Sequence, residues 1–230
     1  MKIGGLQKLT LIDYPGKPAC TVFLAGCNLE CSWCHSPDLV VPGAIKEAPE
    51  ICRDDFFSFL EDRKDVLEGV VICGGEPTVN SQLPDFIQEI KDLGFDVKLD
   101  TNGTNPQMLA KLIKKGLLDY VAMDIKAPLN DYRKATGVSV DPDLLRKSIS
   151  IIRRLDDYEF RTTFVPGIHN KENLLEMLKE IEGAKKYFLQ NFRGKVTVDQ
   201  NLKGESGFEK EKMEEFKSLA QKYVQNCQIR

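Results

Sequence analysis

Short apolar runs of strand length alternate along the chain with segments in which apolar residues recur at helical spacing. Six runs rich in β-branched and aromatic residues predict strands. They are CTVFLAG (20–26), GVVICGG (69–75), FDVKLDTNG (95–103), YVAMDIKAP (120–128), YEFRTTFVPG (158–167) and YFLQNF (187–192). Because most of these runs are nearly continuous in apolar residues, they indicate strands covered on both faces, as in a parallel sheet.

Helices with one apolar stripe are predicted between several of these strands, and glycines mark where they stop. The helix after Asn105 starts with Pro106, a residue that favours the first helical turn. The final segment, 208–226, carries scattered apolar residues among many charges and predicts a helix that packs against the sheet. The three stripes are Leu83, Phe86, Ile87, Ile90 and Leu93 before Gly94; Met108, Leu109, Leu112 and Ile113 before Gly116; and Leu174, Leu175, Leu178 and Ile181 before Gly183.

This alternation predicts an α/β fold with a parallel sheet, either open and doubly wound or curled into a barrel. Polar or glycine residues follow five of the six strands, and functional groups gathered from many strand ends are typical of a (β/α) barrel. Six units are fewer than the eight of a full barrel, so we expect a partial (β/α)6 TIM-like barrel. We expect one domain over 1–230, with an N-terminal extension (1–18), a barrel core (19–192) and a C-terminal loop and helix (193–230).

Composition is that of a globular enzyme. The 230 residues contain 42% hydrophobic and 29% charged residues, enough for one sizeable core. The first residues lack a long apolar segment, and no run approaches membrane-spanning length, so we expect a cytoplasmic protein without a membrane partner. With 32 basic and 35 acidic residues, the charge balance gives no indication of nucleic-acid binding.

Three of the seven cysteines lie close together in LAGCNLECSWCHSP, directly after the first predicted strand. Cys27, Cys31 and Cys34 have a C-x3-C-x2-C spacing. Three thiolates can hold three irons of a [4Fe–4S] cube and leave the fourth iron open, whereas an electron-carrying cube normally has four cysteine ligands. A structural zinc site would need a fourth ligand, and no second C-x-x-C follows.

Core packing and disulfide formation are the alternative roles for cysteines. Free cysteines often pack as small hydrophobic residues, which is our interpretation of Cys20, Cys52, Cys73 and Cys227, since none has a partner at ligand spacing. A disulfide framework is disfavoured by the odd number of cysteines and by the size of the chain. For the close triad, the cluster remains the favoured interpretation.

The triad, with Trp33 before its last cysteine and CGGEPT (73–78) downstream, resembles the radical S-adenosylmethionine (SAM) superfamily. The segment IDYPGKPACTVFLAGCNLECSWCHSPDLV (12–40) is similar to the glycyl-radical-activating branch, especially the activating proteins of anaerobic ribonucleoside-triphosphate reductase. The resemblance implies a radical SAM core in which Cys27, Cys31 and Cys34 hold the cluster and SAM completes the open iron. Reduction then cleaves SAM to a 5′-deoxyadenosyl radical, which abstracts a hydrogen atom.

The resemblance also implies where SAM is held. Backbone around Trp33 and His35 approaches its adenine, although Ser36 replaces the asparagine frequent in the family. Gly74, Gly75 and Glu76 resemble the GGE motif that binds the methionine amino group, and glycines permit close backbone approach. An ordinary turn is the alternative. The remaining residues implied to lie near the cofactor are Asp100, Thr101, Asp124, Lys126, Arg161 and Thr163, with a monovalent cation beside its carboxylate in some members.

Charges within apolar strands have a simpler explanation, an internal Asp–Lys salt bridge, because buried charges are costly unless paired. Asp100, Asp124 and Lys126 are open to both interpretations. The loop after Cys34 lacks a further cysteine cluster, so we expect a separate electron donor of the flavodoxin or ferredoxin type.

The function expected from these features is generation of a glycyl radical on a partner enzyme, anaerobic ribonucleotide reductase first among the candidates. Within the superfamily the alternatives are a pyruvate formate-lyase-type activating enzyme and a small-molecule enzyme like 7-carboxy-7-deazaguanine synthase. Outside it, the alternative is a non-catalytic iron–sulfur redox sensor.

Overall fold

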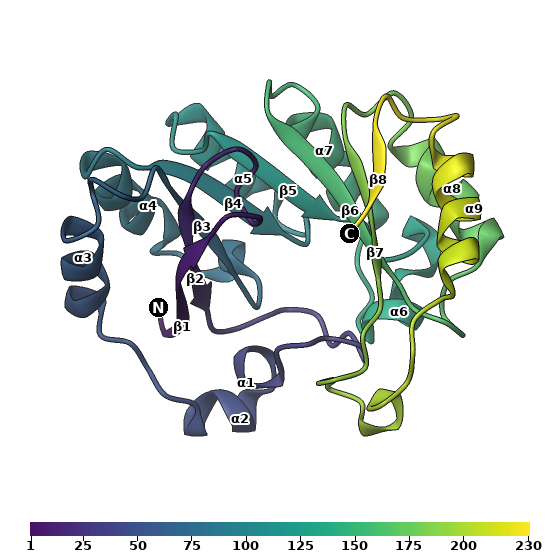
Figure 1. The fold of residues 1–230 in the computed structure, drawn as a ribbon, viewed down its shortest axis with the longest axis horizontal. Helices are drawn as coiled ribbons and strands as arrows, with labels where there is room; N and C mark the ends of the chain where they lie inside the picture. Colours follow the sequence, from purple (N-terminus) through teal and green to yellow (C-terminus); the bar gives the residue numbers. More distant parts are fainter. The chain divides into compact units, whose positions relative to one another are not determined.

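A computed structural model describes all 230 residues of the chain, and its strands form an eight-stranded sheet in chain order (Figure 1). Strand β1 pairs with β2 antiparallel, whereas β2–β3, β3–β4, β6–β7 and β7–β8 pair parallel. The strands are β1 (Ile3–Thr10), β2 (Ala19–Leu24), β3 (Gly69–Gly74), β4 (Asp96–Thr101), β5 (Tyr120–Asp124), β6 (Tyr158–Phe164), β7 (Tyr187–Asn191) and β8 (Cys227–Ile229).

All six predicted strands are present, and two further strands were not predicted. The segment expected to be an N-terminal extension contains β1, whose glycines, glutamine and lysine hide any apolar run. The segment expected to be only loop and helix ends in β8, which has three residues and is too short to give a period. The sheet is therefore mostly, not wholly, parallel.

Nine α-helices lie along the chain, and the predicted helices end at their glycines. Gly94, Gly116 and Gly183 have φ values of 94°, 67° and 78°, a left-handed conformation that glycine adopts at little cost. The helices are α1 (Pro37–Val40), α2 (Pro42–Glu47), α3 (Arg53–Glu61), α4 (Leu83–Asp92), α5 (Pro106–Lys114), α6 (Tyr132–Thr136), α7 (Pro142–Ile152), α8 (Lys171–Glu180) and α9 (Lys210–Ala220), with short 3-10 turns η1 (Pro77–Val79), η2 (Leu129–Asp131) and η3 (Gln200–Leu202).

The chain divides into two compact units that interleave in sequence. Unit 1 comprises residues 1–28, 36–101 and 107–121, and unit 2 comprises 29–35, 102–106 and 122–230. In unit 1 the apolar stripe of α4 is fully buried at Leu83, Phe86, Ile87 and Ile90. Each such side chain contributes about 1.5–3 kcal/mol by leaving water.

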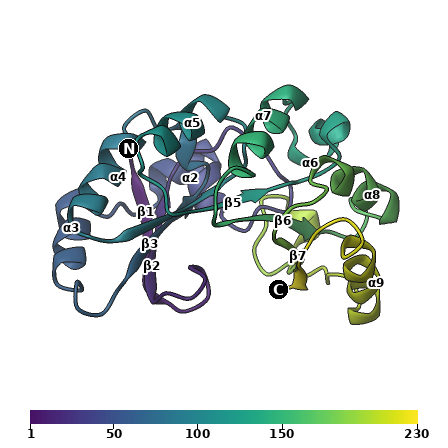
Figure 2. The same ribbon diagram turned by 90° about the horizontal axis from the view of Figure 1, so that it is seen from above.

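Unit 2 is built on β6, β7 and β8 with the C-terminal helix packed on them. Helices α8 and α9 lie side by side (Figures 1 and 2), and α9 also contacts β7 and β8. Met213, Phe216 and Ala220 form its buried face, with the Phe216 ring 5.0 Å from that of Phe164. The final helix therefore packs against the sheet, as predicted.

None of these helices combines the length and the apolar character that crossing a membrane requires.

Candidate functional site

The cysteine loop follows β2 directly. Cys27 belongs to unit 1, and Cys31 and Cys34 belong to unit 2, where the Cys34 amide donates a hydrogen bond to the Cys31 carbonyl (3.0 Å). All three thiols are free. The chain contains no group of three or more His, Cys, Asp or Glu side chains already gathered at metal-binding positions. The structure thus brings Cys31 and Cys34 into one tight turn, and the three-cysteine ligand set remains a prediction.

Burial raises the pKa of the Cys31 thiol, while the positive charge of Lys126 favours its thiolate. Cys31 is 7% exposed. A thiolate is the form that ligates iron–sulfur clusters, and a cation beside the Cys31 thiol favours that form. The chemistry of this donor set therefore fits an iron–sulfur cluster.

The predicted glycine motif at the end of β3 packs onto the backbone that leads to Cys27. The amide of Glu76 donates to the Gly26 carbonyl (2.7 Å), and the amide of Gly75 donates to the Leu24 carbonyl (2.8 Å). A Cβ atom on Gly75 would lie 2.1 Å from the Gly26 oxygen, and one on Gly74, whose φ is 125°, would lie 2.2 Å from the Leu24 oxygen. Only glycine permits this close approach.

Glu76 is buried, and its carboxylate organises the residues around it. Its Oε1 accepts hydrogen bonds from the Thr78 amide (3.1 Å), the Thr78 hydroxyl and the Thr101 hydroxyl (2.7 Å). Thr101 lies at the end of β4, so two predicted site residues from neighbouring strands meet in unit 1. Glu76 also caps the short turn η1.

Asp100 forms an internal salt bridge with Lys98, a residue that the sequence interpretation missed. Lys98 is 1% exposed, and its ammonium group also lies 5.9 Å from the centre of the Tyr120 ring. The salt-bridge alternative for Asp100 is therefore realised, with Lys98 as its partner. Residues two apart on a strand share a face, and that rule could have identified Lys98.

In unit 2, two cationic side chains contact the carboxylate of Asp124. Its Oδ1 accepts from the Arg161 Nε at 2.9 Å, and its Oδ2 lies 3.5 Å from the Lys126 Nζ. The Tyr132 hydroxyl accepts from the Lys126 amide (3.0 Å), and burial raises the pKa of this tyrosine far above its usual range. Three of the predicted site residues thus form one partly buried cluster of charges.

This cluster continues through two residues that were not predicted, Glu159 and Arg230. The Arg161 Nη1 lies 4.0 Å from the fully buried carboxylate of Glu159. Both Arg230 Nη atoms donate to that carboxylate, at 2.9 and 3.2 Å. Glu159 precedes Arg161 by two positions and so shares its face, whereas nothing local connects it with Arg230. Thr163, on the same face, donates to Gln190 at 3.5 Å.

Trp33 and His35 have different environments. Trp33 is buried, with its ring edge-on to His169 at 5.7 Å, and His35 is exposed and stacked on Phe192 at 5.9 Å. The His169 Nδ1 accepts from the Val165 amide (3.0 Å) and its Nε2 meets the Lys126 carbonyl (2.9 Å). Burial lowers the pKa of His169, so this ring is a neutral packing element.

The four remaining cysteines differ in their burial. Cys20 and Cys227 are buried, and burial raises the pKa of each thiol to about 12, which agrees with packing roles. Cys73 packs against a core cluster that includes Tyr14 and Tyr120. Cys52 is exposed at the start of α3, so its assignment to the core is wrong.

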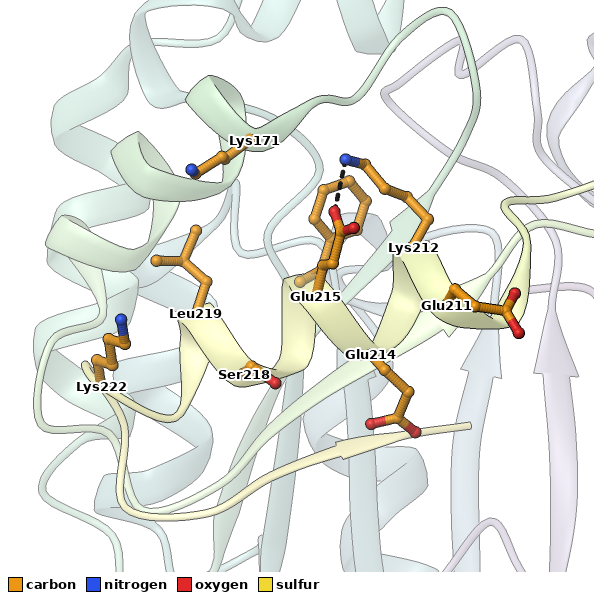
Figure 3. A pocket seen from close by; sticks show the side chains of 9 residues that line it. Lys171, Glu211, Lys212, Glu214, Glu215, Ser218, Leu219 and Lys222 are labelled. Atoms are coloured by element: carbon orange, nitrogen blue, oxygen red, sulfur yellow. Dashed lines mark hydrogen bonds and ion pairs between the residues drawn. The ribbon is translucent and has the colours of Figure 1, made fainter.

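A surface hollow of about 550 Å³ lies along α9 and is also lined by Lys171 of α8 (Figure 3). Charged side chains line most of it, among them Lys212 and Glu215, which form an ion pair at 2.8 Å. The hollow contains no thiol and no predicted site residue, and so is separate from the cysteine loop.

Comparison with known proteins identifies the family. Residues 21–181 match the family model described as the radical SAM superfamily. The chain belongs to the radical SAM superfamily. It is 32% identical over 237 aligned residues to the Methanocaldococcus jannaschii protein named "Putative glycyl-radical enzyme activating enzyme MJ1227", covering 99% of this chain and 95% of that one.

Other relatives share parts of the chain. The 7-carboxy-7-deazaguanine synthase of Methanopyrus kandleri is 31% identical over 137 residues, 50% of this chain and 52% of the relative. Among solved structures, SuiB of Streptococcus suis, which is also known bound to S-adenosylmethionine, superimposes with a TM-score of 0.65 at 15% identity. That superposition covers 91% of this chain and about half (49%) of SuiB.

These findings confirm the α/β fold class with a radical SAM partial-barrel core, and they make the chain an enzyme of radical chemistry. The family implies a [4Fe–4S] cluster and SAM as cofactors. Family membership also favours an enzyme over the redox sensor considered as an alternative.

Proposed function

We propose that this radical SAM enzyme generates a glycyl radical on a partner protein, and that the partner is anaerobic ribonucleoside-triphosphate reductase. The chain is 32% identical to a named activating enzyme along nearly its whole length. The choice of reductase as partner depends on the resemblance of residues 12–40 to its activating proteins. A separate flavodoxin or ferredoxin supplies the electron.

The observation that carries the proposal is the contact between the glycine motif and the cysteine loop. Gly75 and Glu76 lie against Gly26, the residue before Cys27, at distances that exclude a side chain on Gly75. Backbone of β3 is thereby fixed beside a proposed cluster ligand. A SAM amino group bound there would have carbonyl oxygens within reach as acceptors, because neither glycine covers the backbone.

Each predicted site residue has a role in this proposal. Cys27, Cys31 and Cys34 hold the cluster, and together the cluster and SAM supply a one-electron route to hydrogen-atom abstraction. Gly74, Gly75 and Glu76 hold the amino end of SAM, and backbone near Trp33 and His35 contacts its adenine. The residues assigned to its carboxylate, with or without a monovalent cation, and to the rest of the cofactor are Asp100, Thr101, Asp124, Lys126, Arg161 and Thr163.

The internal contacts support this division of roles. Thr101 donates to the same Glu76 oxygen as Thr78, which fixes the carboxylate and the β3 end together. Asp124 is held between Arg161 and Lys126, and the Lys126 ammonium in turn favours the thiolate of the buried Cys31. Because both arrangements are held by several hydrogen bonds, the side chains are ordered before any ligand arrives.

The second candidate is a small-molecule reaction like that of 7-carboxy-7-deazaguanine synthase. The Methanopyrus kandleri relative, 31% identical over half of this chain, favours it. A pyruvate formate-lyase-type partner is a further alternative within the activating branch. The residues around the cluster would serve all three reactions, and only the substrate distinguishes them.

An anaerobic assay tests the proposal. After reconstitution with iron and sulfide and reduction, we expect the protein to convert SAM to 5′-deoxyadenosine. Addition of anaerobic ribonucleotide reductase should give a glycine-centred radical by electron paramagnetic resonance. A fully assembled cluster that does not cleave SAM, with or without partner proteins, would contradict radical chemistry. Cleavage without a glycyl radical on the reductase would contradict only the choice of partner.

Cysteine variants test the ligand set. Changing Cys27, Cys31 or Cys34 to alanine should abolish the brown absorbance of the reconstituted cluster. The same change at exposed Cys52 or at Cys227 should leave the absorbance intact. Retained iron and absorbance in any one of the first three variants would remove that cysteine from the ligand set.

A further inference from the structure

The loop between β7 and α9, residues 192–207, is held in one shape by its own backbone. Arg193 and Ser206 form an isolated β-bridge, and the Gly204 amide donates to the Gly194 carbonyl at 2.7 Å. A Cβ on Gly194 would lie 2.5 Å from the carbonyl oxygens of Leu202 and Glu205, so the two sides of the loop are in direct contact. The backbone of this loop is therefore held in one conformation.

The same loop is attached to the cysteine loop within unit 2. The Val198 amide donates to the Cys34 carbonyl at 3.1 Å, and the Asp199 amide donates to the Ser32 carbonyl at 2.9 Å. The ring of Phe192 stacks on that of His35. The backbone of this loop is thus one hydrogen bond away from a proposed cluster ligand.

Most of its exposed charged side chains are basic. Arg193, Lys195 and Lys203 are exposed, and none of them takes part in an ion pair. Of the two acidic residues, the Asp199 carboxylate accepts from the Asn201 amide (2.9 Å) to cap η3, which leaves Glu205 as the exposed one. A shallow hollow of about 320 Å³ is lined by Arg193, Lys195 and Glu205 among its residues. With three basic and two acidic residues the loop has a net charge of +1, on a chain whose net charge is −3.

We propose that loop 192–207 is the docking surface for an acidic one-electron carrier protein. This inference rests on the proposed function, because it presumes a cluster at Cys27, Cys31 and Cys34 that must be reduced from outside. The carrier, a flavodoxin-type protein in its two-electron-reduced form, loses one electron and becomes a semiquinone. A cluster held by Cys27, Cys31 and Cys34 would accept that electron, and the hydrogen bond from the Val198 amide to the Cys34 carbonyl attaches the docking surface to the cysteine loop.

The charge and the position of the loop together favour an acidic electron-carrier protein as its partner. Three unpaired cations attract an acidic protein and accelerate its association, an effect that salt weakens. A nucleic acid would contact many phosphates, and three cations on one loop of an acidic chain are few for that role. An electron carrier also needs proximity to the cluster, which the attachment to Ser32 and Cys34 provides.

A charge-reversal variant tests the proposal, with reduced recombinant flavodoxin as the probe. The variant carries Arg193→Glu, Lys195→Glu and Lys203→Glu. A matched control carries Lys147→Glu, Arg154→Glu and Lys179→Glu, which reverse the same residue types at other exposed positions of unit 2. For the reconstituted enzyme we measure the Kd for flavodoxin at low and high salt and the rate of 5′-deoxyadenosine formation. Electrons come either from flavodoxin or from light-driven deazaflavin reduction.

The variant should bind flavodoxin roughly tenfold more weakly at low salt, or worse, and the difference should shrink at high salt. Flavodoxin-driven cleavage should fall in parallel, while deazaflavin-driven cleavage and iron content stay unchanged. The control should behave as the wild type. Equal flavodoxin binding by the variant and the control overturns the proposal, as does a wild type that binds neither flavodoxin nor ferredoxin.

Failure of the proposed function gives a different result, since deazaflavin-driven cleavage would then be absent from the wild type itself. A neutral variant with Arg193→Gln, Lys195→Gln and Lys203→Gln covers the case in which charge reversal prevents folding. It should lie between the wild type and the reversed variant in affinity. Neutral substitutions that leave the affinity unchanged would also overturn the proposal.

Discussion

Substitution of Gly75 by alanine should damage the site at its most tightly packed point. The added Cβ would lie 2.1 Å from the oxygen and 2.6 Å from the carbon of the Gly26 carbonyl, and 3.1 Å from the Leu39 oxygen. All three neighbours are backbone atoms, which cannot rotate away as a side chain could. Gly75 does not have a positive φ, so the effect is one of contact and not of backbone strain.

The cost can be worked from these contacts. Non-bonded carbon atoms normally lie about 3.5 Å apart or more, so the Gly26 carbonyl must move by roughly an ångström. Overpacking of this kind costs about 1–3 kcal/mol. The movement also strains the hydrogen bonds from Glu76 to Gly26 and from Gly26 to Leu39, both 2.7 Å, each worth about 1 kcal/mol. We expect a loss of about 2–5 kcal/mol and, because Cys27 follows Gly26, reduced cluster binding.

Urea unfolding of the apo protein, with iron and sulfide analysis after reconstitution, measures both effects. Gly43→Ala is the matched control, since Gly43 lies in α2 with a negative φ and no atom within 4 Å of an added Cβ. That change should be neutral or stabilising by up to about 1 kcal/mol. If Gly75→Ala unfolds within about 1 kcal/mol of the wild type and binds as much iron, the packing argument is wrong.

Two other changes probe unit 2. Glu159→Gln leaves Arg230 and Arg161 beside a neutral amide and should lower the free energy of unfolding in urea by about 1–3 kcal/mol, less than for a fully buried pair because Arg230 is partly exposed. Glu214→Gln is the control, because its ion pair with Lys217 lies at the surface, and it should change stability by under about 1 kcal/mol. Equal effects of the two substitutions would refute the claim that the buried carboxylate contributes more. Burial holds the pKa of His169 below its ordinary value of about 6.5. The stability that neutral His169 provides is therefore fully present above pH 6.5, and it is lost as the pH falls through the lowered pKa. His169→Gln should therefore reduce the difference in unfolding free energy between pH 7.5 and 5, whereas a like reduction in the exposed His35→Gln variant would contradict this assignment.

Several features of the site could be read from local sequence, and others could not. The period of two along a strand places Lys98 with Asp100 and Glu159 with Arg161, so both pairs were accessible to prediction even though they were missed. Arg230 lies 71 residues from Glu159, and only the parallel pairing of β7 with β8 brings the C-terminal segment to it. Loop 192–207 has no sequence motif that marks it as a docking surface. Its proposed role depends on its hydrogen bonds to Ser32 and Cys34, which only the folded chain forms.

The sequence by itself determined the chemistry and the repeating α/β pattern. Three closely spaced cysteines and an alternation of apolar runs are local properties, and they survive any arrangement of the rest of the chain. Tertiary structure decided which charges pair, that Cys52 is exposed, and that β1 and β8 flank the predicted strands. The physical reason is that pairing and burial depend on contacts between residues far apart in sequence, which only the folded backbone brings within a few ångströms.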